Sequence, residues 1–96
     1  MDKANESAKP KTDILNRLSR IEGQVKGIKR MIEEEKTCAD ILTQVAAVRA
    51  AMNKVGGLIL EQYAKECVVK SINSENKEQE LESLLNTVQR FLKYVD

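Results

Sequence analysis

The chain has 96 residues, which suits one domain with one core of modest size. Apolar residues make up 42% of the sequence but aromatic residues only 3%, so that core must be aliphatic. Sixteen basic and fifteen acidic residues give a net charge of +1, and no histidine is present. The near-neutral net charge excludes binding to nucleic acid through overall charge alone. The absence of histidine excludes Ser-His, Cys-His and His-metal chemistry.

The first ten residues, MDKANESAKP, are mostly small and polar and end at the only proline. We expect them to form a disordered leader ahead of a single helical domain at residues 11–96. They lack the apolar stretch of a secretory signal, and no later apolar run reaches the ~18 residues of a membrane span. We therefore expect a cytoplasmic protein without a membrane partner, in which cysteines are more often reactive or metal-binding than permanently bridged.

A heptad pattern predicts the first helix at residues 12–36. Thr12 can cap its N-terminus, and Asp13 suits the positive end of the helix dipole. The apolar positions recur at alternating intervals of four and three residues, which indicates a coiled-coil seam. The seam consists of Ile14, Leu18, Ile21, Val25, Ile28 and Ile32.

A second helix is predicted from Cys38 to about Ile72. At the start of this helix, Thr37 and Asp40 resemble a capping box with Asp in place of Glu. Gly56-Gly57 interrupts this helix, and the close approach of another helix is the expected compensation. Its seam repeats the spacing of the first helix and consists of Ile41, Val45, Val48, Met52, Val55 and Ile59.

A third helix is predicted at residues 76–95, so the fold class is all-α with a three-helix subunit. The second helix would be about 50 Å long and cannot bury its whole seam against the shorter first helix. We therefore expect the first two helices to pair with their copies from a second chain in an antiparallel four-helix bundle. The apolar face of the third helix consists of Leu81, Leu84, Leu85, Val88, Phe91, Leu92 and Val95.

The two cysteines lie 29 residues apart on the second predicted helix, which places both thiols on one face but about 43 Å apart. A disulfide needs Cα atoms within about 7 Å, so Cys38 and Cys67 cannot meet within one chain. A two-fold axis near their midpoint, at Met52 and Asn53, brings Cys38 of one chain to Cys67 of another. Cys38, at the first position of its helix, is the better nucleophile and Cys67 the better resolving thiol. Two interpretations stand at this point: a reactive pair, or two small core residues.

Metal binding is the other chemistry open to two cysteines. Soft thiolates suit Cu(I), and two of them can form a linear site. The residue one turn before Cys67 is Tyr63, whose phenol is a poor ligand for Cu(I). Zinc, nickel and cobalt would lack ligands because the chain has no histidine. We therefore expect no cofactor, with Cu(I) as the alternative.

Basic residues gather in the first predicted helix. Six basic residues oppose two acidic ones between Lys11 and Arg30, whereas residues 71–96 carry three basic and five acidic ones. Arg17 and Arg20 lie beside the seam, and the second helix can extend the patch with Arg49 and Lys54. The pattern fits either a solvated face or contact with the phosphates of double-stranded DNA.

The segment RLSRIEGQVKGIKRMIEEEKTCADILTQVAAVRAAMNKVGGLIL, residues 17–60, and the later Glu66-Cys67-Val68 resemble the copper-sensitive operon repressor (CsoR) family. The resemblance spans roughly residues 11–95. It implies all-α subunits that assemble into a disc-shaped homotetramer, a dimer of dimers. It also implies a repressor that binds operator DNA and is released when an inducer binds or modifies it.

Copper sensors of this family use a Cys, then a His and a Cys one turn apart on the second helix. Cys38 and Cys67 match the two Cys positions, whereas Tyr63 stands at the His position. This pattern resembles the persulfide-sensing, CstR-like branch. The resemblance implies that Cys38 attacks a low-molecular-weight persulfide or polysulfide and that Cys67 of the partner chain closes a di-, tri- or tetrasulfide bridge. Bridging would release the DNA and derepress sulfide-detoxification genes; a Cu(I)-responsive repressor with two thiolates is the alternative.

The resemblance also bears on the basic residues. Arg17 and Lys54 match family positions implicated in DNA binding, while Arg20 and Arg49 follow from the charge pattern alone. No acid–base constellation or cofactor motif is visible, so we do not expect an enzyme. A structural helical module with inert cysteines is the remaining class, and salt-dependent DNA binding would exclude it.

Overall fold

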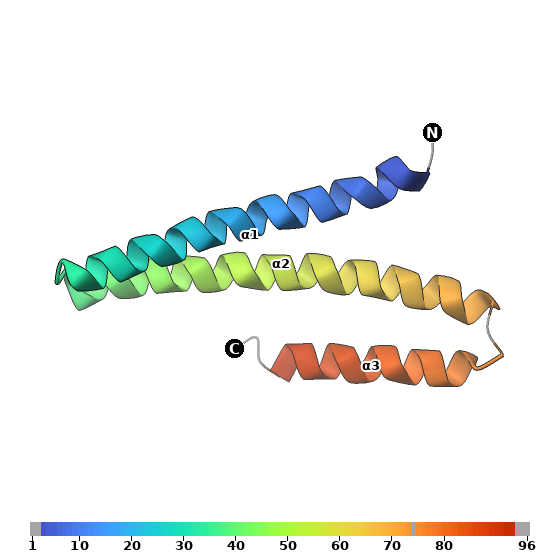
Figure 1. The fold of residues 1–96 in the computed structure, drawn as a ribbon. Coiled ribbons are helices and arrows are strands. Elements are labelled where there is room, and N and C mark those ends of the chain that lie inside the picture. The colour runs from blue at the N-terminus through green and yellow to red at the C-terminus, as the bar shows by residue number, and fades with distance from the viewer. Residues whose placement is uncertain (1–2, 74, 94–96) are drawn as a thin grey trace. The chain divides into compact units, whose positions relative to one another are not determined.

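The computed structural model describes residues 3–73 and 75–93, and within them it contains three helices and no strand (Figure 1). The helices are α1 (Lys3–Glu33), α2 (Cys38–Asn73) and α3 (Lys77–Lys93). This confirms the prediction of an all-α chain with three helices. Across the described part of the chain, no helix combines the length and apolar character needed to cross a bilayer.

The chain divides into two compact units, Met1–Val55 and Gly56–Asp96. The first unit holds α1 and the first half of α2, and the second holds the rest of α2 and α3. The boundary falls at the Gly56-Gly57 pair, where helix propensity is lowest in α2.

The start of α1 differs from the prediction. The helix begins at Lys3 and runs through Pro10, so Thr12 lies inside the helix and does not cap it. Residues 3–10 of the expected disordered leader are therefore helical, and residues 1–2 lie outside the described part of the chain. Proline costs the helix one backbone hydrogen bond. The Lys, Ala and Glu residues of this segment are good helix formers, which favours the helical conformation on both sides of Pro10.

The end of α1 is a Schellman motif built on a non-glycine residue. The Lys36 N–H donates to the Met31 carbonyl at 3.0 Å, and the Glu35 N–H donates to the Ile32 carbonyl at 3.1 Å. Glu35 has a φ of 57°, the left-handed conformation that this motif requires. The helix therefore stops at Glu33, three residues earlier than predicted, and the chain reverses direction into α2.

The start of α2 follows the prediction. The Asp40 N–H donates to Thr37 Oγ1 at 3.2 Å, and the Ile41 N–H donates to the Thr37 carbonyl at 3.1 Å. Thr37 is thus the N-cap, and Asp40 lies in the first turn where its charge complements the helix dipole.

In the first unit the coiled-coil seam is only half covered. Ile21 and Val55 are buried, whereas Val25 and Met52 are exposed. Apart from half-buried Leu18, the covered positions on each helix lie seven residues apart and alternate with exposed ones, as in one side of a larger bundle. The covered positions are Ile14, Ile21, Ile28, Ile41, Val48 and Val55, and the exposed ones are Val25, Ile32, Val45 and Met52.

In the second unit α3 runs antiparallel to the second half of α2 (Figure 1). A Cβ atom built on Gly56 would lie 2.5 Å from Phe91 Cε1, so the absence of a side chain at Gly56 makes room for the Phe91 ring. This confirms the expected close approach at the glycine pair, but only for Gly56, because the space around Gly57 is open. None of the described residues of α3 is buried. Val95, expected on its apolar face, lies outside the described residues.

Candidate functional site

Cys38 is the first residue of α2, and its side chain is exposed. The first N–H groups of a helix have no intrahelical acceptors and stabilise negative charge. The Thr37 side chain accepts one of these groups, the N–H of Asp40. The Cys38 thiol is therefore accessible to solvent at the N-terminal end of α2.

Cys67 lies in the second unit and is buried, with 4% of its surface exposed. It follows Gly56 by eleven residues, which is about three turns plus 20°, so the two share one face of α2. Because Gly56 accommodates Phe91 of α3, helix geometry predicts that Cys67 also lies on the α3 side of α2. The two cysteines thus differ in solvent access, and their roles as nucleophile and resolving thiol stay a prediction.

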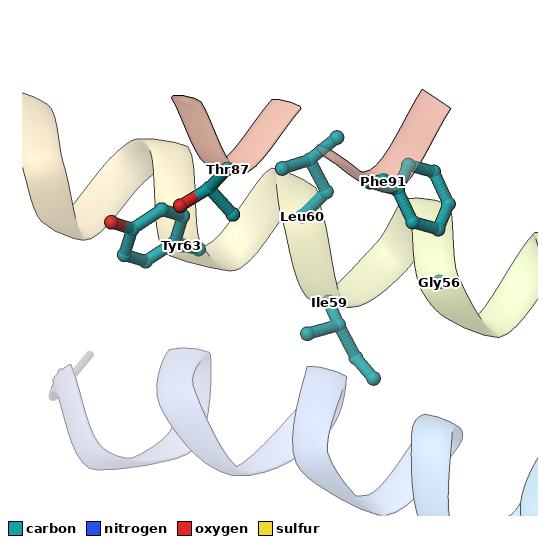
Figure 2. Close-up of a pocket in the computed structure, with 6 residues that line it drawn as sticks. All are labelled: Gly56, Ile59, Leu60, Tyr63, Thr87 and Phe91. Carbon is teal, nitrogen blue, oxygen red and sulfur yellow. The ribbon is translucent and has the colours of Figure 1, made fainter. Parts of the chain in front are cut away.

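Tyr63 lies one turn before Cys67, on the same face of α2. It is half-buried and borders an open, mainly apolar groove of about 600 Å³ between α2 and α3 (Figure 2). In Figure 2 the Tyr63 ring and the Thr87 side chain lie close together at one end of the groove, with Phe91 at the other. The lining consists of Gly56, Ile59, Leu60, Tyr63, Thr87 and Phe91.

The structure does not bring the two cysteines together within one chain. Cys38 belongs to the first unit and Cys67 to the second, and a continuous helix joins them. The pairing of Cys38 with Cys67 of a second chain stays a prediction. Of the metals, nickel and cobalt do not fit this donor set, because the chain has no imidazole and its described residues hold no cluster of three metal-ligating side chains. Cu(I) fits only as a two-thiolate site formed between chains.

Arg17 is engaged in an ion pair on the surface of α1. Its Nε lies 3.0 Å from Asp13 Oδ2, one turn earlier, and both side chains are partly exposed. Such exposed pairs contribute roughly 0.5 kcal/mol or less, so Arg17 can exchange this partner for a phosphate at little cost. Sequence reasoning assigned Asp13 to the helix start and missed this role, although its four-residue spacing from Arg17 was visible.

All four basic residues singled out from the sequence belong to the first unit and lie at one level of it. Because α1 ends at Glu33 and α2 begins at Cys38, residues equally far from these ends lie side by side in the antiparallel pair. Arg17 and Lys54 are each 16 residues away, Arg20 is 13 and Arg49 is 11. The four therefore fall within about 8 Å along the helix axes.

They do not all lie on one side of the pair. Buried Ile21 and Val55 mark the directions in which α1 and α2 face each other. Measured around each helix axis from these directions, three basic residues are rotated by about 40–100° in one sense: Arg17, Arg20 and Lys54. Arg49 is rotated by about 120° in the other sense, which is also the sense of exposed Val25 and Met52. In an antiparallel pair, equal senses fall on the same side. Arg17, Arg20 and Lys54 thus form a basic flank, and Arg49 lies apart from it.

Comparisons with known proteins identify the family of the chain. The model of a family described as metal-sensitive transcriptional repressors matches residues 10–90. The chain belongs to this family. It is similar to the copper-sensing transcriptional repressor CsoR of Bacillus subtilis, with 45% identity over 97% of this chain and 99% of that protein.

Two solved structures are similar as well. The nickel-responsive transcriptional regulator InrS has a TM-score of 0.75 and 44% identity, covering 83% of this chain and 90% of that chain. The copper-sensing repressor CsoR with Cu(I) from Geobacillus thermodenitrificans has a TM-score of 0.75 and 42% identity, covering 84% of each chain. The family resemblance and the expectation that the chain is no enzyme are confirmed. These relatives are named for copper and nickel, so the persulfide-sensing branch stays a prediction.

Proposed function

We propose that this repressor binds double-stranded operator DNA and is released when reactive sulfur species modify Cys38 and Cys67. The observation that carries the proposal is the asymmetry of its two thiols in a chain without histidine. Cys38 is exposed at a helix N-terminus, Cys67 is buried, and Tyr63 stands one turn from Cys67 where a copper site would need a nitrogen ligand. As operator binding requires access to the chromosome, we also propose a cytoplasmic location.

The chemistry needs no oxidant besides the persulfide itself. The Cys38 thiolate attacks the outer sulfur of a persulfide RSSH, forming Cys38–SSH and releasing RSH after proton transfer. The Cys67 thiolate of the partner chain then attacks the Cys38 sulfur, forming a disulfide and expelling H₂S. If both cysteines are first converted to persulfides, their condensation gives a trisulfide and H₂S, and a longer polysulfide donor gives a tetrasulfide.

A second copy of the chain is needed to complete this site. The exposed half of the seam, Val25, Ile32, Val45 and Met52, provides an apolar strip on one side of the first unit. Burying that strip against the same strip of a second copy completes an antiparallel four-helix bundle with its two-fold axis near Met52 and Asn53. Two such dimers would form the proposed homotetramer, and bridging would clamp each dimer in a form that binds DNA poorly.

The proposed DNA contact is the basic flank of Arg17, Arg20 and Lys54, on the side opposite the apolar strip. Each charge that meets a phosphate steepens the dependence of affinity on salt. Arg20→Ala should reduce that slope by about one charge, whereas Arg49→Ala should change it less, because Arg49 lies apart from the flank. Operator titrations at several salt concentrations measure both effects.

The test of sensing is intact-mass spectrometry under non-reducing conditions, after anaerobic treatment of reduced protein with glutathione persulfide. We expect covalent dimers with extra sulfur atoms and a bridge mapped from Cys38 to Cys67, together with loss of operator binding. Cys38→Ser should keep its DNA affinity and lose the response, whereas Cys67→Ser should accept sulfur at Cys38 without forming dimers. Normal release of Cys38→Ser from DNA by the persulfide would contradict the proposal.

A Cu(I)-responsive repressor is the second candidate, favoured by the copper-sensing relative at 45% identity. Both proposals use the same two thiols, so Cu(I) affinity separates them. A site of two thiolates should lose Cu(I) to a strong competing chelator that leaves a site with an added imidazole intact. Retention of stoichiometric Cu(I) against that chelator, together with release from DNA, would favour copper sensing.

A further inference from the structure

The thiol predicted to complete the bridge is covered by a helix that is weakly held. Cys67 is 4% exposed, and it lies on the face of α2 that meets α3. The two helices run antiparallel, and Gly56 lies opposite Phe91. Cys67, eleven residues after Gly56, therefore lies at the level of the α3 residue eleven positions before Phe91. That residue is Glu80, which is half-buried, and α3 thus reaches over Cys67 with its first turn.

The side chains of α3 are only partly covered in this chain. None of its described residues is buried, and an open groove of about 600 Å³ lies beside Phe91 where tighter packing would exclude solvent. Leu81, Leu85 and Leu92 are exposed. The Phe91 ring occupies the space left by the missing side chain of Gly56. Elements with few buried apolar residues open locally at less than the cost of global unfolding, so we expect α3 to undock while the rest of the chain stays folded.

We propose that α3 is a lid over Cys67 and that Phe91, by docking on Gly56, keeps the lid closed. Phe91 is a positioning residue that acts through α3 and does not touch the thiol. Cys38 reacts in the closed state, whereas Cys67 reacts only after α3 has undocked. Resting on the proposed function, this lid delays bridging until the first thiol has been modified, so brief contact with an oxidant does not release the repressor.

The lid is tested with the full chain and iodoacetamide, a thiol reagent that needs neither DNA nor persulfide. The thiolate displaces iodide, and the modification of each cysteine is followed over time by acid quenching, digestion and mass spectrometry. We expect Cys67 in the unmodified sequence to react at least tenfold more slowly than Cys38. Cys38 in the same sample serves as the internal reference for reagent and pH.

Two substitutions loosen the contact from its two sides. Phe91→Ala removes the ring, and Gly56→Ala forces the ring to move because its Cβ would lie 2.5 Å from Phe91 Cε1. Both should accelerate alkylation of Cys67 at least tenfold without changing the rate of Cys38, and Phe91→Leu should restore part of the protection. The matched control is Leu92→Ala, an apolar truncation at an exposed neighbour on the same helix, which should change neither rate.

The alternatives give distinct results. Cys67 rates that stay unchanged in both Phe91→Ala and Gly56→Ala overturn the lid, as does a Cys67 that already reacts as fast as Cys38. Equal acceleration of both cysteines in every variant would show global unfolding and would also overturn it. Loss of the persulfide response with intact protection of Cys67 would refute the proposed function and leave the lid in place.

Discussion

At the residue scale, the left-handed backbone of Glu35 marks a position where the sequence is not optimal for stability. An L-residue in this conformation costs about 1 kcal/mol relative to glycine, yet the Schellman hydrogen bonds at the end of α1 require it. Glu35→Gly should raise the free energy of unfolding by about 1 kcal/mol, which shifts the melting temperature by about 4–8 °C in a domain of this size. The control is Glu33→Gly, at the last residue of α1, which should lower stability. Circular dichroism measures both melting temperatures, and equal shifts in the two variants would contradict this account of the turn.

Asp13 restrains the basic flank at the same scale. Its carboxylate holds Arg17 Nε at 3.0 Å and places a negative charge beside the proposed phosphate contact. Asp13→Asn should therefore increase operator affinity several-fold at low salt, with the gain shrinking as salt screens the interaction. Glu22→Gln is the matched control, because it removes the same charge from α1 on the opposite side, about 100° from Ile21. An equal gain in both variants, measured by fluorescence anisotropy, would indicate only a change in net charge.

At the element scale, the two adjacent glycines of α2 differ in what surrounds them. Gly57 has open space where a side chain would be, so Gly57→Ala should stabilise the helix by about 1 kcal/mol. Gly56→Ala gains the same propensity but must displace Phe91, and it should be neutral or destabilising. Chemical denaturation of the two variants checks the difference, and a Gly56→Ala variant as stable as Gly57→Ala would contradict the close approach.

The extent to which the elements could be predicted depends on how local their signals are. The start of α2 was predictable, because Thr37 and Asp40 form a cap that needs no tertiary information. The start of α1 was not, because Pro10 and Thr12 suggest a boundary while the flanking residues favour helix, and only the competition between them decides. The glycine pair predicted a close approach but not its partner. Adjacent residues point about 100° apart, so the choice between Gly56 and Gly57 depends on where α3 docks.

The candidate site shows the same division. The exposure of Cys38 follows from its place at a helix start, whereas the burial of Cys67 depends on which face of α2 meets α3. The separation of Arg49 from the basic flank could not be predicted from the sequence either. Both seam positions of each heptad are apolar in the sequence, and only the structure shows which of them the chain itself covers.

At the scale of the whole molecule, the exposed half of the seam predicts where two copies of the chain pack together. Met52 is 44% exposed and lies next to the proposed two-fold axis, so the two copies of Met52 would meet across it. Met52→Lys would place two like charges in the proposed apolar interface, which costs several kcal/mol and should convert the proposed oligomer to monomers. Analytical ultracentrifugation measures the mass, and operator binding should weaken in parallel because phosphate contacts are then no longer repeated across the assembly.

Ala50→Lys provides the matched control for this prediction. Ala50 is exposed on α2 and is rotated by about 140° from Val55, in the sense opposite to that of Met52. Ala50→Lys adds the same charge two residues from Met52, but the new side chain stays in solvent. The mass of the assembly should therefore not change. If Met52→Lys keeps the mass of the unmodified protein, the apolar strip is not the interface. The pairing of Cys38 with Cys67 across the two-fold axis would then lose its structural basis, because the axis is placed by that strip.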